Sequence, residues 1–502
     1  MDHALAILNS LADPGASETA KNRDAEIKGY IAGTASIPQA SKAALLDDPR
    51  RAFELTAAIA LQVIDPSQNS IGYLYVLEML MGTGSLPRNF GKRAVMDKIV
   101  LFLTRFDPVQ IRYVGGPFRQ LLDTISSGTW LPPAVAIELL STAILRIEPT
   151  GTIFTSTHLN LARLAVESNV LEPALEVLDK EITCYPIMSS AREARDARDS
   201  RPLCDPGLTP VGYVSSATGL TSSFKSGHVL EYNYFRSLVY LSRREWSKAF
   251  AALEQVVTHP NKDRGVSKVM TDCHKRWVLV GLLKSGKIPV LPGYTSAQST
   301  ATYNSLSAEY KALAALFVSP QAKELKEWAE QNEEIWQEDA TASLITEVLS
   351  AYQKWHIINL RKMFTEVSIG QVRRLTCSAQ TGEPLETDED VVSLIQGMLA
   401  SGMLDGTLEI DGAAGSFLKF GGVAPVLTEE NFAREIATSH ARITALTTQY
   451  KDVNDRLSEK REYVKYMVVE QRRADKEGPD AGVGFDSQIE DEDLMTGIMA
   501  HG

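Results

Sequence analysis

Histidine and cysteine are the residue types here that could bind a metal or act as nucleophiles, and their spacing favours neither role. The 502-residue chain has eight histidines and four cysteines. A catalytic zinc needs several ligands at close spacing and an acid or base nearby. No HExxH, HxH or CxxC occurs. Most histidines are isolated in predicted helices or at their ends, as core or surface residues usually are: His158, His228, His259, His274, His356 and His440.

Motifs for phosphate binding and acyl transfer are missing as well. GTGSLPRNFGKR is the nearest approach to a P-loop, but Gly84 and Gly91 are too far apart, and Arg93 follows Lys92 where Ser or Thr would bind magnesium. No GxGxxG follows a predicted strand, and no GxSxG elbow occurs. We therefore expect no catalytic residue, no metal and no cofactor, and we expect that the chain is not an enzyme.

The charge balance disfavours two classes of partner. Asp and Glu number 63 against 51 Lys and Arg, which gives a formal net charge of -12 and a pI near 5.3. Affinity for nucleic acid rests largely on Lys and Arg that displace counterions, and the same repulsion disfavours anionic membranes. No stretch approaches the roughly 18 uninterrupted apolar residues of a membrane span. We predict no nucleic-acid partner and no membrane partner.

The cysteines and the first thirty residues bear on the cellular compartment. Cys184, Cys204, Cys273 and Cys377 lie far apart, so a disulfide framework is not expected. The N-terminal segment has an Asp at position 2 and only a short apolar run, unlike a secretory signal. Reduced thiols in the cytoplasm and nucleus are the expectation.

Helices are the elements that would carry any site between residues 1 and 340. Apolar residues recur at steps of three and four, and Gly and Pro interrupt them. Short breaks such as TISSGTWLPPAVAIELL and LRIEPTGT each end one helix and begin another, as antiparallel helical hairpins require. At this chain length one compact core is not expected. Residues 1–340 are therefore predicted to form a tetratricopeptide-like helical repeat array.

Two segments of this array resemble each other: THLNLARLAVESNVLEPALEVLDKEITCYP and YNYFRSLVYLSRREWSKAFAALEQVVTHP. Each ends in a proline, Pro186 or Pro260, which would stop its second helix. Small residues at similar places would let the two helices of each hairpin approach closely: Ala162, Ala174, Ser237 and Ala249. Between the two segments, residues 189–227 combine a REARDARDSR run with many Ser, Thr, Gly and Pro residues, which predicts a flexible insertion.

Residues 341–422 change pattern and predict a winged helix. LITEVLSAYQKWHIINLRKMF and SIGQVRRL give two helices, the second opened by a capping box of Ser368 and Gln371. A third helix begins at Thr387 and Asp390, and SGMLDGTLEIDGAAGSFLKF then alternates as two strands around a turn. Three helices followed by a hairpin wing is the winged-helix order.

Winged helices often read DNA with the third helix, so this function is one alternative. The third helix here is preceded and opened by carboxylates that would repel phosphates, and only Arg373 and Arg374 offer compensation. The other alternative is edge-to-edge pairing of the wing with related subunits, because an uncovered strand edge is a template for another chain. The residues predicted for this wing-edge interface are Leu408, Ile410, Leu418 and Phe420.

Residues 428–477 predict one long helix with an apolar seam. The seam runs for about five heptads, which is too long for one small winged helix to cover. Helices of partner chains would cover it, or the helix folds back on its own array. Polar Ser439 and Lys460 interrupt the seam. Residues 478–502 are predicted to form a disordered acidic tail. The predicted bundle interface consists of Phe432, Ile436, Ile443, Leu446, Tyr450, Val453, Leu457, Val464 and Met467.

A helical array that leads into a winged helix and a long C-terminal helix resembles the PCI family, the scaffold subunits shared by the proteasome lid, the constitutive photomorphogenesis nine (COP nine) signalosome and a translation initiation factor. Within it, the chain is most similar to the family of third signalosome subunits. The likeness lies in WSKAFAALEQVVTHP, in HKRWVLVGLLKSGKIPVLPGYTS and in the stretch from TEVSIGQVRRL to MLASGMLDGTLEID. It covers residues 150–470.

This resemblance implies a non-catalytic scaffold in a complex that removes the ubiquitin-like modifier from cullin-RING ubiquitin ligases. The isopeptidase chemistry would belong to a different, metal-binding subunit. The implied partners are other PCI subunits and the metal-binding isopeptidase-type subunits, with cullin-RING ligases as indirect partners. Two alternatives stay open at this point: a PCI scaffold subunit of the proteasome lid, and a winged-helix nucleic-acid adaptor.

Overall fold

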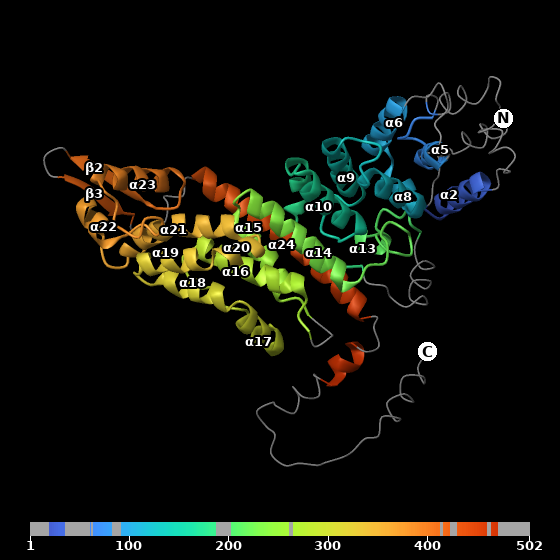
Figure 1. Cartoon of the computed structure of the whole chain (residues 1–502). Helices are drawn as coiled ribbons and strands as arrows, with labels where there is room; N and C mark the ends of the chain where they lie inside the picture. Colours follow the sequence, from blue (N-terminus) through green and yellow to red (C-terminus); the bar gives the residue numbers. More distant parts are fainter. Residues whose placement is uncertain are drawn as a thin grey trace, which may run out of the picture. The chain divides into compact units, whose positions relative to one another are not determined.

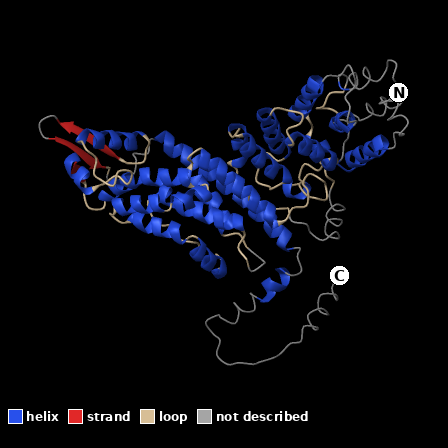
Figure 2. Ribbon diagram, in the orientation of Figure 1, coloured by secondary structure: helices blue, strands red, loops and turns tan. Residues whose placement is uncertain are grey.

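The computed structural model describes residues 20–35, 61, 64–82, 92–186, 202–260, 265–411, 415–421, 429–458 and 463–469, and the described chain is mostly helical (Figure 1, Figure 2). It divides into two compact units, Met1–Phe420 and Gly421–Gly502, which are described separately below. The predicted fold class, a mostly α protein, is confirmed. Within the described residues no helix has both the length and the apolar character needed to cross a bilayer.

The first part of unit 1 consists of short helices joined by tight connections. Asp107 caps α7 by accepting a hydrogen bond from the Val109 N–H at 2.9 Å, and Pro133 opens α9 at a position where no amide donor is needed. Asn169 ends α10 in the left-handed conformation. The helices are α2 (Ala20–Ala35), α5 (Ser70–Gly82), α6 (Lys92–Arg105), α7 (Pro108–Ile111), α8 (Gly115–Ser126), α9 (Pro133–Ile147), α10 (Ser156–Ser168), η1 (Glu172–Ala174) and α11 (Leu175–Leu178).

The second part of unit 1 contains longer helices. Ser267 caps α16 by accepting a hydrogen bond from the Met270 N–H, and Gly286 ends this helix with φ of 65°. The helices are α13 (Pro210–Tyr213), α14 (Ser226–Ser242), α15 (Trp246–Val257), α16 (Lys268–Ser285), α17 (Ala297–Leu306), α18 (Ala308–Val318), α19 (Ala322–Gln331), α20 (Glu333–Glu338) and α21 (Ala342–Leu360).

Two large hydrophobic cores run through this helical part. One lies between Leu61 and Val239 and contains the stacked rings of Tyr73 and Phe102, whose centroids are 5.6 Å apart. The other extends from Tyr240 to Ala379 and is centred on α16. Separate cores along one chain are what a repeat array needs, because each hairpin buries its apolar surface against its neighbours.

The two similar segments form the expected hairpins, with one difference. The four small residues Ala162, Ala174, Ser237 and Ala249 are fully buried, so the predicted close approach of helices is confirmed. The second helix of the first hairpin, however, ends at Leu178, well before Pro186. The Tyr240 hydroxyl donates to the Leu178 carbonyl at 2.7 Å and lies 3.0 Å from the Asp179 carboxylate, and these contacts fix the chain where it leaves the helix.

The prediction of a flexible insertion at 189–227 is wrong for its second half; residues 187–201 lie outside the described part. From residue 202 onward the chain packs on the array, because Tyr213, Val214 and Leu220 enter the first core. Gly115 and Gly219 permit the closest contact: a Cβ on Gly219 would lie 2.5 Å from the Gly116 nitrogen. Composition rich in Ser and Gly signalled flexibility, whereas three apolar residues anchor this segment.

The region predicted to be a winged helix contains α22 (Ile369–Leu375), α23 (Asp388–Ala400) and three short strands, which Figure 2 draws in red. The strands are β1 (Glu366–Ser368), β2 (Gly406–Asp411) and β3 (Gly415–Phe420), in the antiparallel order β1-β3-β2. Val367 pairs with Leu418, and Leu408 pairs with Leu418 from the other side. A third core joins the sheet to α22, α23 and the end of α21. Helix α21 thus contributes to two cores, with Tyr352 in one and Ile357 in the other.

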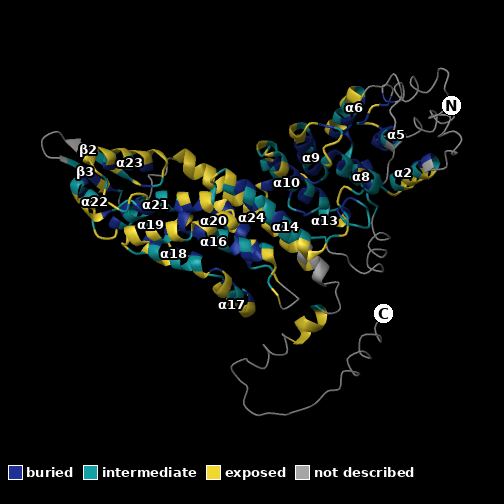
Figure 3. Cartoon of the chain, in the orientation of Figure 1, coloured by how far each residue is buried: buried dark blue, intermediate teal, exposed yellow. Residues whose placement is uncertain are grey.

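Unit 2 contains α24 (Glu429–Ser458), a 30-residue helix, and a further helical stretch at residues 463–469. At 1.5 Å per residue α24 is about 45 Å long. The described side chains of α24 are exposed, and Figure 3 colours such residues yellow on the ribbon. The predicted tail, residues 478–502, lies outside the described part.

Candidate assembly surfaces

The start of α23 is the part of the winged helix that a nucleic-acid reader would use, and here it is acidic and internally bonded. Thr387 and Asp390 form a capping box: the Asp390 N–H donates to the Thr387 hydroxyl at 3.1 Å, and the Thr387 N–H donates to the Asp390 carboxylate at 3.2 Å. Ser368 likewise caps α22 by accepting a bond from the Gln371 N–H. The predicted start of α23 is confirmed, whereas at α22 only the Ser368 half of the predicted capping box is found.

The Arg373 guanidinium bonds to acceptors of the same region. Its Nε lies 3.2 Å from the Asp388 carboxylate, and its Nη1 donates to the Glu386 carbonyl at 2.9 Å. The neighbouring Arg374 donates through Nε to the Gly370 carbonyl at 3.2 Å. These two arginines were the only cations expected to offset the carboxylates of α23. The geometry therefore disfavours phosphate binding at this helix.

The strand order corrects part of the predicted wing edge. Leu418 and Phe420 lie on β3, the central strand, which pairs with β1 on one side and β2 on the other. Both side chains are buried in the third core, at 0% and 6% exposure. They stabilise the module rather than form an edge. The reason is that β1, a three-residue strand before α22, adds to the hairpin on the side of β3.

The outer edge of the sheet belongs to β2. Its six residues pair with β3 on one side, and on the other side no strand of the described chain pairs with them. Leu408 is half-buried and faces the core, while Thr407 and Glu409 are exposed. Ile410 pairs through its backbone opposite Ser416. Whether β2 binds another chain stays a prediction, but its unpaired backbone is the part that could accept a strand.

The predicted seam of α24 lies along a helix whose large apolar side chains face solvent. Phe432, Ile436, Ile443, Leu446 and Tyr450 are 51 to 71% exposed. Val464 and Met467, on residues 463–469, are 46% and 47% exposed. Val453 and Leu457 lie on α24, but their side chains are outside the described part. Single exposed apolar residues are ordinary, whereas a row that recurs at heptad spacing indicates a surface for other helices.

Two buried histidines of unit 1, His158 and His274, occupy structural positions. His158 is buried and its Nδ1 accepts a hydrogen bond from the Thr155 N–H, which completes the cap of α10. His274 stacks on Tyr303 with ring centroids 4.4 Å apart. Burial lowers the pKa of His158 to about 3, and burial with nearby Lys311 lowers the pKa of His274 to about 4. In the described part, no cluster of three His, Cys, Asp or Glu side chains could hold a metal ion.

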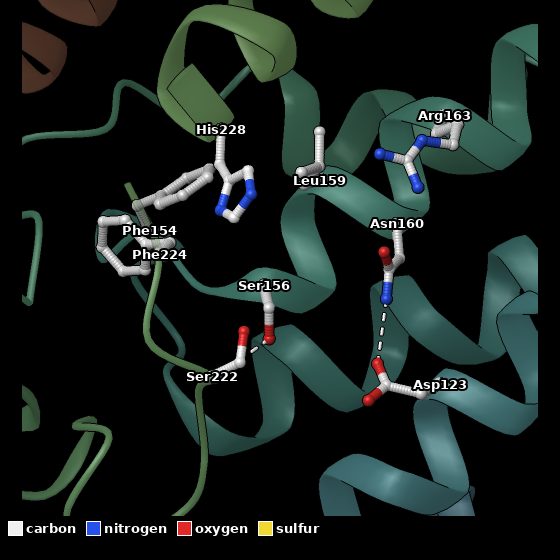
Figure 4. Close-up of a pocket in the computed structure, with 9 residues that line it drawn as sticks. All are labelled: Asp123, Phe154, Ser156, Leu159, Asn160, Arg163, Ser222, Phe224 and His228. Carbon is white, nitrogen blue, oxygen red and sulfur yellow. Dashed lines mark hydrogen bonds between the residues drawn. The ribbon is translucent and has the colours of Figure 1, made fainter. Parts of the chain in front are cut away.

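A pocket of about 320 Å³ lies beside α10 and the segment that precedes α14, as Figure 4 shows. In Figure 4 the Phe154 and Phe224 rings lie together near His228, and dashed lines mark two hydrogen bonds. Asn160 donates to the Asp123 carboxylate at 2.9 Å, and the Ser222 N–H donates to the Ser156 hydroxyl at 3.2 Å. The lining residues are Asp123, Phe154, Ser156, Leu159, Asn160, Arg163, Ser222, Phe224 and His228.

The pocket's polar groups bond mainly to each other and to neighbouring helices. The Arg163 guanidinium contacts the Glu231 carboxylate at 2.6 Å, and Arg119 contacts Asp123 at 3.1 Å. Burial raises the pKa of Asp123 against the opposing effect of Arg119. The Phe154 and Phe224 rings meet edge to face with centroids 4.9 Å apart. This arrangement holds the segment at 222–228 on α10. It does not identify any of the lining residues as a catalytic group.

Comparison with known proteins points to one family. The family described as COP9 signalosome complex subunit 3, N-terminal helical repeats, matches residues 51–203 and 208–298. A Neurospora crassa protein named COP9 signalosome complex subunit 3 is 34% identical over 453 residues, which cover 88% of this chain and 90% of that protein. The protein of the same name from Emericella nidulans is 29% identical over 344 residues, which cover 67% of this chain and 68% of that protein.

Proposed function

Because the chain belongs to the family of COP9 signalosome complex subunit 3, we propose that it is a non-catalytic scaffold subunit of a signalosome that acts on cullin-RING ubiquitin ligases. The isopeptidase step, which would remove the ubiquitin-like modifier, is assigned to a different, metal-binding subunit. This chain would hold neighbouring PCI subunits and the isopeptidase-type subunits in place. The proteasome-lid alternative shares the architecture, but the matching family and relatives do not favour it.

The exposed apolar face of α24 carries the proposal. Five large apolar side chains between Phe432 and Tyr450 stand at least half exposed along one helix. Burying the exposed part of each side chain against a partner helix stabilises the assembly by about 1 to 2 kcal/mol. The steps between them are three or four residues, with one step of seven across Ser439, and this spacing fits the packing of a helical bundle rather than an irregular protein surface.

The open edge of β2 is the second proposed contact. Its backbone could accept a strand from the wing of another PCI subunit, and Thr407 and Glu409 would lie at that junction. An internal Arg373–Asp388 ion pair and three carboxylates at the start of α23 oppose the nucleic-acid adaptor alternative.

Assembly of α24 variants tests the function. We expect Ile443→Asp combined with Leu446→Asp to abolish co-purification of the full chain with the complex from its native cells. Deletion of residues from Thr428 onward should have the same effect and leave the array folded. The matched control is Ala441→Asp, which adds a charge on the opposite side of the same helix turn, where the side chain is also exposed. Full assembly of the double variant, quantified by mass spectrometry of the purified complex, would refute the proposal.

A further inference from the structure

The segment between α16 and α17, residues 286–296, exposes apolar side chains that neither assembly surface uses. Val290 is 85% exposed, Tyr294 is 74% exposed and Ile288 is 46% exposed. Exposure of such side chains to water costs free energy, because burial of apolar surface stabilises a protein by about 25 cal/mol per Å². A group of three within seven residues therefore indicates a surface for a partner.

Contacts with α16 and α21 hold the same segment in place. Gly286 has φ of 65° and packs so closely on Trp355 that a Cβ there would lie 2.5 Å from the indole ring. The Trp355 indole N–H donates to the Leu283 carbonyl at 3.3 Å. Pro289 packs on Gly281, and Leu291 contacts the core around α16. The exposed residues are thus held in place by buried neighbours.

From Ile288 to Leu291, burial alternates as it does along a strand. Ile288 and Val290 face outward, whereas Pro289 and Leu291 face the protein. In an extended chain, residues that share a face also direct their N–H and C=O groups to the same edge. The amides of Ile288 and Val290 therefore share one edge. The opposite edge lacks a donor at Pro289, which confines strand pairing to one side.

The backbone groups in question are unpaired within the described chain. The Gly286 N–H donates to the Leu282 carbonyl at 2.8 Å, and the Thr295 N–H donates to the Pro292 carbonyl at 2.9 Å. Between these two bonds, the backbone of residues 287–291 makes no hydrogen bond with any residue that the structure describes. An exposed row of free amides beside apolar side chains is a template for an added strand.

Two lysines accompany the segment, in a chain with a net charge of -12. Lys284 and Lys287 are exposed, and both precede Ile288 in the sequence. The Lys284 ammonium lies over the Phe250 ring, 4.4 Å from its centroid. Neither lysine is paired with a carboxylate of the described residues. A partner segment with Asp or Glu would complement these two cations.

We infer that residues 287–291 pair with an extended, acidic segment of a neighbouring subunit, which adds as a strand along Ile288 and Val290. Its apolar side chains cover Val290 and Tyr294, and its carboxylates lie near Lys284 and Lys287. The partner is a permanent subunit of the complex, because permanent interfaces are more hydrophobic than transient ones and cover apolar surface of this kind. The inference rests on the proposed scaffold function and extends it to a third contact.

Hydrogen–deuterium exchange tests the inference in the intact assembly. Peptides spanning residues 286–292 are compared between the purified full chain and the chain in the native complex. We expect the amides of Ile288 and Val290 to exchange about tenfold more slowly, or slower still, in the complex. Unchanged exchange in a complex that contains the chain overturns this inference and leaves the proposed function intact. Failure of the wild-type chain to enter any complex overturns the proposed function itself.

Two variants separate strand pairing from charge complementarity. Val290→Asp should restore fast exchange at residues 288–290, and Lys284→Glu combined with Lys287→Glu should weaken the protection about tenfold. The control is Lys323→Glu, an exposed lysine on α19 that should leave protection unchanged. A photo-crosslinking residue at position 290 should then capture an extended acidic segment of another subunit. A crosslink to a helix, to a basic segment or to this same chain would contradict the inference.

Discussion

Helices α16 and α24 are both long and carry large apolar side chains, yet these side chains meet opposite environments. In α16 the residues from Trp277 to Leu283 are all buried, with Cys273 and His274 one turn before them. In α24, Phe432, Ile443 and Tyr450 are 53%, 63% and 71% exposed. A stretch of helix that is buried on all sides has its neighbours within its own chain. A helix with one regular apolar stripe and an otherwise polar surface needs neighbours from elsewhere.

The largest difference between the two helices should appear on truncation of an aromatic residue. Trp277 is 1% exposed and stacks on Phe250 with ring centroids 5.3 Å apart. Trp277→Ala should lower the free energy of unfolding by about 3 to 5 kcal/mol, because it removes buried area and leaves a cavity. Urea unfolding of the full chain, followed by circular dichroism, measures this loss.

Tyr450→Ala on α24 is the matched control, since Tyr450 is also a large aromatic residue but is 71% exposed. It should change the free energy of unfolding by less than about 0.5 kcal/mol. Equal losses for Trp277→Ala and Tyr450→Ala would show that the contrast between the two helices is not real.

A smaller expected effect is the dependence of the free energy of unfolding on pH, to which buried histidines contribute and an exposed histidine on α24 does not. His158 and His274 are neutral in the fold, where their pKa values are lowered by burial to about 3 and about 4. In the unfolded chain a histidine has a pKa near 6.5, so below about pH 6.5 the unfolded state binds protons that the folded state does not. Their contribution is thus present above pH 6.5 and is lost as the pH falls toward 4.

Together the two histidines should reduce stability by about 2.7 kcal/mol for each pH unit between about pH 6 and pH 4. The double variant His158→Asn, His274→Asn should show a shallower loss of stability in urea unfolding at pH 6 and pH 5. His440→Asn on α24, where the imidazole is exposed, is the control and should leave the slope unchanged. A slope unaltered by the double variant would mean that the buried imidazoles do not control the acid sensitivity.

Local patterns in the sequence predicted most of the architecture. The small residues at Ala162 and Ser237 predicted close helix packing, and Thr387 with Asp390 predicted the start of α23, because caps and small residues act over a few positions. The seam of α24 was predicted because its spacing is periodic. Each of these features is decided by neighbours in the sequence.

Features that depend on distant residues were missed. The early end of the first hairpin at Leu178 depends on the Tyr240 hydroxyl, 62 positions away. The central place of β3 depends on β1, three residues that no alternation pattern could reveal. The exposed face of Ile288 and Val290 depends on Pro289 packing against Gly281. The one local signal was the run KIPVLPGY, whose prolines favour an extended chain outside a helix.

The smallest expected effect is that of Ile443→Asp on stability, and it tests whether the apolar stripe of α24 is covered within its own chain. In the isolated full chain, Ile443→Asp should change the free energy of unfolding by less than about 0.5 kcal/mol, because a charge at a 63% exposed position stays hydrated. It should also reduce self-association of the chain in analytical ultracentrifugation, since an apolar stripe left in water drives chains together. If other residues of the same chain cover the stripe, the aspartate has to be desolvated, and urea unfolding would report a loss of several kcal/mol. That result would favour a helix satisfied within its own chain and would remove the physical basis for assembly through α24.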